Sequence, residues 1–235
     1  MKMTTIWMGA LAILSGSANA AQVYDSYDAF YAAQPGAVFG APIEQDADSI
    51  YSLPGEQGIY THLRSALDGK TVRIDVAENR ITVNGKTYRF ARATTFPGEY
   101  AIDIDPASAR VFLARGTRIR PSLLCLEGDG SGSGEADRHK QIFLLLDPLA
   151  RNAAWLHLPS LLSSCRAVVA TNYGRFAFPK NSYLFDETQE SRIGLLVSYH
   201  TFAHRRFASV PAPKQVRLRF THPEIPFQFS VQDKN

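Results

Sequence analysis

From Thr71 onward the sequence consists of short segments in which apolar and polar residues alternate, separated by turn residues. The clearest case is the pair of segments Arg80 to Val83 and Thr87 to Phe90, which flank Asn84-Gly85. Asn-Gly tolerates the positive φ angles of a type I′ turn, so this stretch predicts a two-stranded hairpin. Alternation over a few residues is typical of strands with one buried face. The pattern therefore restricts the chain to a mainly β, antiparallel fold.

Further strands are expected along the rest of the chain. They cover residues 71–76, 99–104, 110–114, 118–126, 140–146, 153–158, 166–171, 193–202, 215–221 and 226–231. A succession of strands joined by short turns forms hairpins and a meander. We expect one globular domain over residues 21–235, with a small propeller-like or barrel-like closure as the alternative arrangement.

One or two short helices are expected before the strands and packed against them. Aromatic and apolar residues recur at helical spacing between Val23 and Tyr31, and Gln34-Pro35-Gly36 ends the run. A second helix is expected over residues 56–67, because Asp68-Gly69 would end it.

The first twenty residues have the three ordered parts of a cleavable signal peptide. Lys2 supplies the positive region, Ile6 to Leu14 is largely apolar, and Ala18-Asn19-Ala20 gives the small-x-small cleavage pattern. Cleavage after Ala20 would leave Ala21 as the mature N-terminus. The apolar run is well short of the ~20 residues that span a bilayer, so we expect no membrane insertion after cleavage. The predicted location is the bacterial periplasm, with secretion as the alternative.

Cys125 and Cys165 are the two cysteines of the chain. In an exported protein an even number of cysteines within the folded part predicts a disulfide. A cysteine nucleophile would instead need a reduced thiol in an oxidising compartment, and the disulfide is the preferred interpretation.

The charge balance argues against nucleic acid as a partner, because 25 Lys and Arg stand against 22 Asp and Glu. The distribution is uneven. Residues 21–60 hold six acids and no Lys or Arg, whereas the chain from residue 61 holds 24 basic and 16 acidic residues. The acidic segment could cover a basic face of the same fold or bind a basic partner; simple solvation is the preferred interpretation.

Two groups of arginines could contact an anionic ligand or an acidic partner. One is Arg205-Arg206, directly after His204. The second group comprises Arg110, Arg115, Arg118 and Arg120. Within it, Arg118 and Arg120 would share a strand face. A solvated sheet face is the preferred interpretation of both groups.

Other candidate sites lack part of their pattern. His200 and His204 have a ligand-like spacing, but the surrounding sequence favours a strand and offers no third ligand. Residues 127–135 resemble a calcium loop, but Arg138 occupies the place of the bidentate Glu. Asp103 and Asp105 would share a strand face, which is too common an arrangement to indicate a glycosidase. We predict no metal and no cofactor.

The sequence identifies no catalytic residues, since no convincing nucleophile, acid–base pair or metal-ligand set is present. We therefore favour a protein that is not an enzyme. We expect an exported, non-catalytic binding protein of the bacterial envelope, with inhibitor or immunity-type activity as the specific hypothesis and another envelope protein as the partner. The alternative is an envelope hydrolase whose catalytic residues come from distant strands. A deep pocket that joins a histidine to a carboxylate would favour the hydrolase. A structural or assembly role is the third hypothesis.

Overall fold

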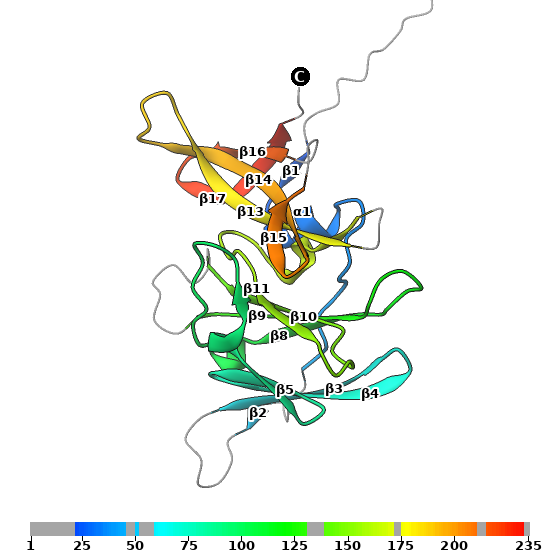
Figure 1. Ribbon diagram of the computed structural model, residues 1–235. Coiled ribbons are helices and arrows are strands. Elements are labelled where there is room, and N and C mark those ends of the chain that lie inside the picture. Colours follow the sequence, from blue (N-terminus) through cyan, green and yellow to red (C-terminus); the bar gives the residue numbers. More distant parts are fainter. Residues whose placement is uncertain are drawn as a thin grey trace, which may run out of the picture.

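The computed structural model describes residues 22–45, 50–51, 59–130, 139–171, 175–210 and 215–232. The predicted signal peptide and its cleavage site between Ala20 and Ala21 lie outside the described residues. The described chain is mainly strand and forms three sheets that stack as layers (Figure 1). This confirms the mainly β, antiparallel fold class. None of the described helices is long and apolar enough to cross a bilayer.

The N-terminal sheet is a meander of neighbouring antiparallel strands in the order β2-β3-β4-β5-β6. The strands are β2 (Ile50–Tyr51), β3 (Tyr60–Leu67), β4 (Lys70–Ala77), β5 (Arg80–Val83) and β6 (Lys86–Arg89). The predicted Asn-Gly hairpin joins β5 to β6, with φ of 49° at Asn84 and 82° at Gly85. The hairpin prediction is therefore confirmed.

The helix predicted over residues 56–67 is wrong for the residues that the structure describes, because Tyr60–Leu67 is strand β3. Asp68-Gly69 does not end a helix. These two residues have φ of 50° and 75° and form the tight turn into β4. A Gly with positive φ ends helices and also closes hairpins, so the residue pair alone does not distinguish the two.

The central sheet has the order β7-β11-β10-β9-β8 and is antiparallel apart from the parallel pair β7 and β11. Its elements are η1 (Phe90–Arg92), β7 (Thr94–Thr95), η2 (Pro106–Ser108), β8 (Arg110–Ala114), β9 (Leu123–Gly128), β10 (Gln141–Leu146) and β11 (Ala154–His157). The strand predicted over residues 99–104 is wrong, since only Ile104 makes an isolated bridge, to Gly130. The strand predicted over residues 118–126 begins only at Leu123.

The C-terminal sheet has the order β1-β17-β16-β14-β13-β12, with β15 paired to β14. Its elements, with the short helix η3 beside them, are β1 (Val23–Tyr24), η3 (Cys165–Ala167), β12 (Val169–Ala170), β13 (Phe176–Phe185), β14 (Arg192–Ala203), β15 (Arg206–Ser209), β16 (Gln215–His222) and β17 (Ile225–Gln232). The three sheets are open, since the outer strands of each are not paired with one another in the described chain. The alternative of a closed propeller or barrel is therefore not found there.

The sequence did not predict β13, because Pro179 lies in its middle. Proline lacks the N–H that a central strand needs. The neighbour β12 pairs only with Phe176 and Ala177, so at Pro179 the far edge of β13 has no described strand to bond with. The proline is accommodated because this part of the strand lies at an edge.

Helix α1 (Tyr27–Ala32) confirms the first predicted helix. Ser26 caps it by accepting the N–H of Ala29, as is usual for Ser at this position. Its aromatic face is buried, and the Tyr27 ring stacks on Phe229 of β17 with the ring centroids 4.4 Å apart. The helix thereby covers one face of the C-terminal sheet.

The central sheet is buried on both faces, which explains the long apolar runs of β9 and β10. Residues such as Leu124 and Phe143 pack toward the N-terminal sheet, whereas their neighbours Cys125 and Leu144 belong to the core shared with the C-terminal sheet. Successive side chains of a strand point to opposite faces, so a sheet between two others requires apolar residues at every position.

Candidate functional site

A pocket of about 660 Å³ opens beside β11 and the turn between β14 and β15. Its walls contain three arginines from distant parts of the chain, Arg92 of η1, Arg151 before β11 and Arg205 of the turn. Trp155 and Phe202 supply its aromatic surface. The pocket therefore combines cationic side chains with apolar rings.

A second pocket of about 520 Å³ adjoins the first, since Arg92 and Trp155 line both. It adds two further arginines, Arg80 of β5 and Arg89 of β6. We call the two pockets together the arginine groove; its arginines are Arg80, Arg89, Arg92, Arg151 and Arg205. The groove runs from the edge of the N-terminal sheet to the β14–β15 turn.

The groove is built around a rigid aromatic residue. Trp155 is 8% exposed, stacks on Phe143 with the ring centroids 5.1 Å apart, and donates its indole N–H to the Arg89 carbonyl at 3.1 Å. Lys86 makes a second bridge between the two sheets by donating to the Arg151 carbonyl at 2.8 Å. These bonds hold β6 and the start of β11 together and fix the backbone that carries the arginines.

Arg205 reaches the groove from a strained turn. Ala203 pairs with Arg206, so His204 and Arg205 form a two-residue hairpin turn, with φ of 51° and 61°. Such turns normally contain Asn-Gly, because other L-residues pay about 1–2 kcal/mol each in the left-handed region. Strain of this kind is common at functional sites.

The electrostatic character of the groove is uniformly positive. None of its five arginines forms an ion pair with a described residue, and the described residues that line the two pockets include no Asp or Glu. The hydroxyl of Tyr88, which lines the second pocket, is buried and has no hydrogen-bond partner in the described chain. Arginines without counterions attract carboxylate or phosphate groups, so the groove can bind an anion.

The structure separates the arginines that the sequence grouped. Arg205 lines the groove, whereas Arg206 begins β15 and is not among the residues that line it. Arg110 lies on β8 and pairs with the buried Glu127 and the partly exposed Asp28. Arg118 and Arg120 lie in the loop before β9, so the expectation that they share a strand face is wrong.

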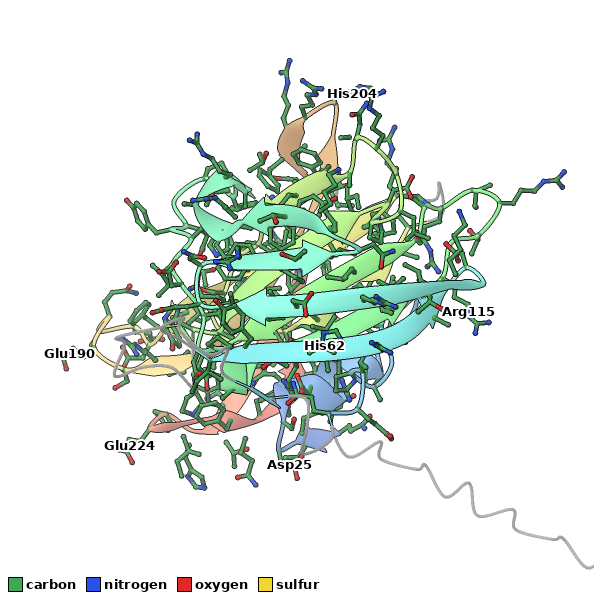
Figure 2. All side chains as sticks on the ribbon, turned by 90° about the horizontal axis from the view of Figure 1, so that it is seen from below. Asp25, His62, Arg115, Glu190, His204 and Glu224 are labelled. Carbon is green, nitrogen blue, oxygen red and sulfur yellow. A yellow bond between two sulfur atoms is a disulfide. The ribbon has the colours of Figure 1, made fainter. Side chains whose placement is uncertain are left out.

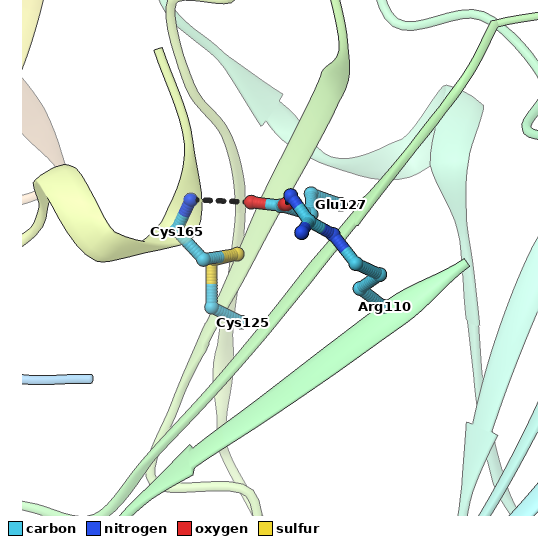
Figure 3. The surroundings of a disulfide bond; sticks show 4 residues. All are labelled: Arg110, Cys125, Glu127 and Cys165. Carbon is cyan, nitrogen blue, oxygen red and sulfur yellow. Dashed lines mark hydrogen bonds and ion pairs between the residues drawn. A yellow bond between two sulfur atoms is a disulfide. The ribbon is translucent and has the colours of Figure 1, made fainter. Parts of the chain in front are cut away.

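A second polar cluster lies beside the disulfide (Figure 3). Glu127 of β9 has no exposed surface, and its Oε2 accepts the N–H of Cys165 at 2.6 Å. Its Oε1 pairs with the guanidinium of Arg110, which also lies 3.3 Å from Asp28 of α1. Burial raises the pKa of the Glu127 carboxyl, against the pull of Arg110. The cluster ties α1, β8, β9 and η3 together and has a structural role.

The predicted disulfide is present and joins β9 to η3, with the two Cα atoms 5.8 Å apart. Both cysteines are fully buried, and neither is free. A cysteine nucleophile is therefore excluded in this state. Asp28 is the member of the acidic N-terminal segment that meets a basic residue of the later chain; Asp46, Asp48 and Glu56 lie outside the described residues.

The structure does not bring together the residues of the other candidate sites, which are the histidine pair, the aspartate pair and the calcium-like segment. His200 lies within β14, and His204 lies in the turn that follows it. Among the described residues no three His, Cys, Asp or Glu side chains come together as metal ligands would. Asp105 caps η2 by accepting the N–H of Ala107, so Asp103 and Asp105 do not form a pair on a strand. Most of the calcium-like segment, residues 131–138, lies outside the described residues.

One group of side chains has the composition of a hydrolase triad but not its order. Ser160 Oγ lies 3.3 Å from Glu99 Oε2 and 3.3 Å from His139 Nδ1. In a catalytic triad the imidazole lies between the hydroxyl and the carboxylate, whereas here the hydroxyl lies between the other two. Ser160 is 5% exposed. The order of these three side chains therefore differs from that of a catalytic triad.

Sequence reasoning missed four of the five groove arginines. Arg80, Arg89, Arg92 and Arg151 have no common spacing, and they come together only through the packing of two sheets. The one usable signal is local: the pair His204-Arg205 occupies a two-residue hairpin turn where Asn-Gly is usual. Comparison of the chain with protein-family models, with curated proteins and with solved structures finds no match.

Proposed function

We propose that this chain is an exported, non-catalytic binding protein whose arginine groove receives an acidic segment of another envelope protein. The observation that supports this function is the convergence on one groove of five arginines, none of which forms an ion pair with a described residue. Arginine forms bidentate bonds with carboxylates, so Asp and Glu side chains are the natural counterparts of these residues.

The aromatic residues of the groove favour a protein as the partner. Protein interfaces concentrate their binding energy in a few Trp, Tyr and Arg side chains, surrounded by weaker contacts. Phe202, which is partly buried, lies beside Arg92, Arg151 and Arg205 in one pocket, and the mostly buried Trp155 adds a small apolar surface; this is the composition of such an interface. The arginines would add speed and specificity of association.

An inhibitor or immunity-type role is the specific form of this proposal. Such proteins need rapid and selective capture of one partner, which a concentrated positive field provides. The disulfide is compatible with an oxidising, extracytoplasmic location. The hydrolase hypothesis has less support, because no histidine is among the residues that line the two pockets of the arginine groove.

Site-specific crosslinking in the producing cells tests the proposal. A photoreactive amino acid at Asn152, in the wall of the groove, should crosslink to one envelope protein. The same amino acid at the exposed Thr188, between β13 and β14, is the matched control and should not. The double variant Arg151→Glu/Arg205→Glu should abolish the Asn152 crosslink.

The purified pair then gives the quantitative test. Binding should weaken with added salt, because exposed charge pairs are screened over about 8–10 Å at 0.1–0.15 M salt. Charge reversal at Arg151 and Arg205 should weaken it by at least about a hundredfold, since each arginine contributes roughly 1.5–3 kcal/mol. An identical crosslink from the reversed variant, or none at all from Asn152, would overturn the proposed function.

A further inference from the structure

The outer face of the N-terminal sheet carries a second set of four arginines, two of which also belong to the groove. Figure 2 looks onto this sheet, with His62 of β3 labelled near its centre. Four consecutive strands each contribute one arginine to the face, Arg64 from β3, Arg73 from β4, Arg80 from β5 and Arg89 from β6. The apolar residues between them, such as Leu63 and Ile74, point into the core.

The strand register places these arginines in two directly opposed pairs. Arg64 faces Arg73 across β3 and β4, and Arg80 faces Arg89 across β5 and β6. Like charges in direct opposition destabilise a sheet. None of the four forms an ion pair with a described residue, and the one acid within β3–β6, Asp75, lies 2.5 Å from His62. The fold therefore maintains two like-charged pairs with which no described acid forms a direct ion pair; Asp75 lies on the same face, in the row between them.

Hydroxyl groups lie between the two arginine pairs. Thr82 of β5 pairs with Thr87 of β6, and their Oγ1 atoms are 3.4 Å apart. This row continues through Asp75 of β4 to His62 of β3, which contact one another. It lies two residues from each arginine pair along the strands and on the same face. From Arg64 to Arg89 the arginines span about 20 Å, given strands ~4.8 Å apart and ~3.3 Å per residue. We call this set the arginine track.

We propose that the arginine track binds a linear acidic polysaccharide. Guanidinium groups pair with the carboxylate or phosphate groups of such a chain, and the threonines bond its hydroxyls. The shape also fits, because cations spread over four neighbouring strands can all be reached by one extended chain.

The composition of the face argues for a glycan over a protein. Protein interfaces are anchored by large apolar side chains. None of the exposed large apolar residues of the described chain lies on β3, β4, β5 or β6. The track shares Arg80, Thr87 and Arg89 with the second pocket of the groove, whereas Arg64 and Arg73 line neither pocket, so substitutions at Arg64 and Arg73 test the track separately.

Titration of the full mature protein with oligomers of galacturonic acid tests the inference. Calorimetry should show affinity rising with oligomer length until the chain spans the track, and little binding of neutral glucose oligomers of equal length. The variant Arg64→Gln/Arg73→Gln should weaken binding at least about tenfold, since two charge-assisted contacts are lost. Arg217→Gln/Arg219→Gln, which removes two exposed arginines of β16, is the matched control and should bind as the wild type does.

Stability measurements separate lost binding from lost folding. Because Arg64 and Arg73 repel one another, the double Gln variant should unfold at the same or a higher temperature than the wild type without ligand. Unchanged binding by this variant would overturn the inference. So would tighter, track-dependent binding of poly-glutamate or of phosphatidylglycerol vesicles, which would assign the face to a protein or to a membrane. The groove variant Arg151→Glu/Arg205→Glu should leave glycan binding intact, so the two proposals fail separately.

Discussion

His157 and Gln141 fix each other's orientation in the central sheet. His157 Nε2 lies 3.0 Å from Gln141 Oε1, and the same oxygen accepts the N–H of Ile102 at 3.1 Å. Since that oxygen accepts, we assign the proton of the neutral imidazole to Nε2. Nδ1 is buried and has no hydrogen-bond partner in the described chain, so a proton added there would be a donor without an acceptor.

The protein should therefore lose stability as the pH falls below neutrality. Burial lowers the pKa of His157 to about 4, from an ordinary value of 6.5. Between these values the unfolded chain binds a proton that the folded chain does not, so stability is complete above pH 6.5 and is lost toward pH 4. This one group should reduce the free energy of unfolding by about 3 kcal/mol between pH 7 and pH 4.

Urea unfolding at pH 7, 5.5 and 4 measures the effect, and His157→Gln is the control. The variant lacks the titrating ring, so its stability should fall less steeply over this range, whatever its stability at pH 7. If wild type and variant lose stability in parallel below pH 6.5, His157 is not the group responsible.

The sequence predicted those helices and strands whose own residue pattern, such as a turn pair or an apolar face, is enough to define them. The β5–β6 hairpin follows from Asn84-Gly85, and α1 follows from its aromatic face. Strand β13 was missed because Pro179 is compatible with it only when the length of β12 is known. The arginine groove was missed for a related reason, because its residues meet through the packing of separate sheets and share no spacing in the chain.

Removal of the disulfide should lower stability by about 4 kcal/mol on the chain-entropy model, because the bond closes a loop with a sequence separation of 40. Chemical unfolding of Cys125→Ser/Cys165→Ser against the wild type measures the difference. The variant should be insensitive to reductant, whereas wild type reduced in denaturant and refolded under reducing conditions should approach the stability of the variant. Equal stabilities would show that the packing around the bond is sufficient without it.

Replacement of Glu127 should be among the most damaging single changes. Glu127→Ala leaves the buried N–H of Cys165 without its acceptor and removes the buried partner of Arg110, whose side chain is 35% exposed, so we expect a loss of about 1–3 kcal/mol. Thermal or urea unfolding measures the loss. Asp28→Asn removes the partly exposed partner of the same guanidinium and should cost at most about 1 kcal/mol. Similar losses for both variants would contradict the importance of the buried carboxylate.

Gly194 should not tolerate a side chain. A Cβ at this position would lie 2.0 Å from the Leu218 carbonyl oxygen, on the neighbouring strand β16. Gly194→Ala must therefore separate β14 from β16, with an expected loss of about 3 kcal/mol or more. Gly40→Ala is the control, since no atom lies within 4 Å of its Cβ, and it should change stability by less than about 0.5 kcal/mol. Comparable stabilities of the two variants in urea would contradict this.

Substitutions in the His204-Arg205 turn should have opposite effects on the stability of the protein and on its binding of the partner. His204→Asn/Arg205→Gly restores the residues that a type I′ turn prefers and should raise the free energy of unfolding by about 1–2 kcal/mol. It also removes one arginine of the groove, so binding of the crosslinked partner should weaken by about tenfold or more.

His204→Asn alone separates the two effects, because it relieves part of the strain and keeps Arg205. This variant should be stabilised by about 1 kcal/mol or less and should bind the partner as the wild type does. If the double variant is both more stable and fully active, the strained turn has no role in binding. If it is less stable, the positive φ angles at His204 and Arg205 cost nothing. The expected result is that the chain keeps a less stable turn because Arg205 is needed at the groove.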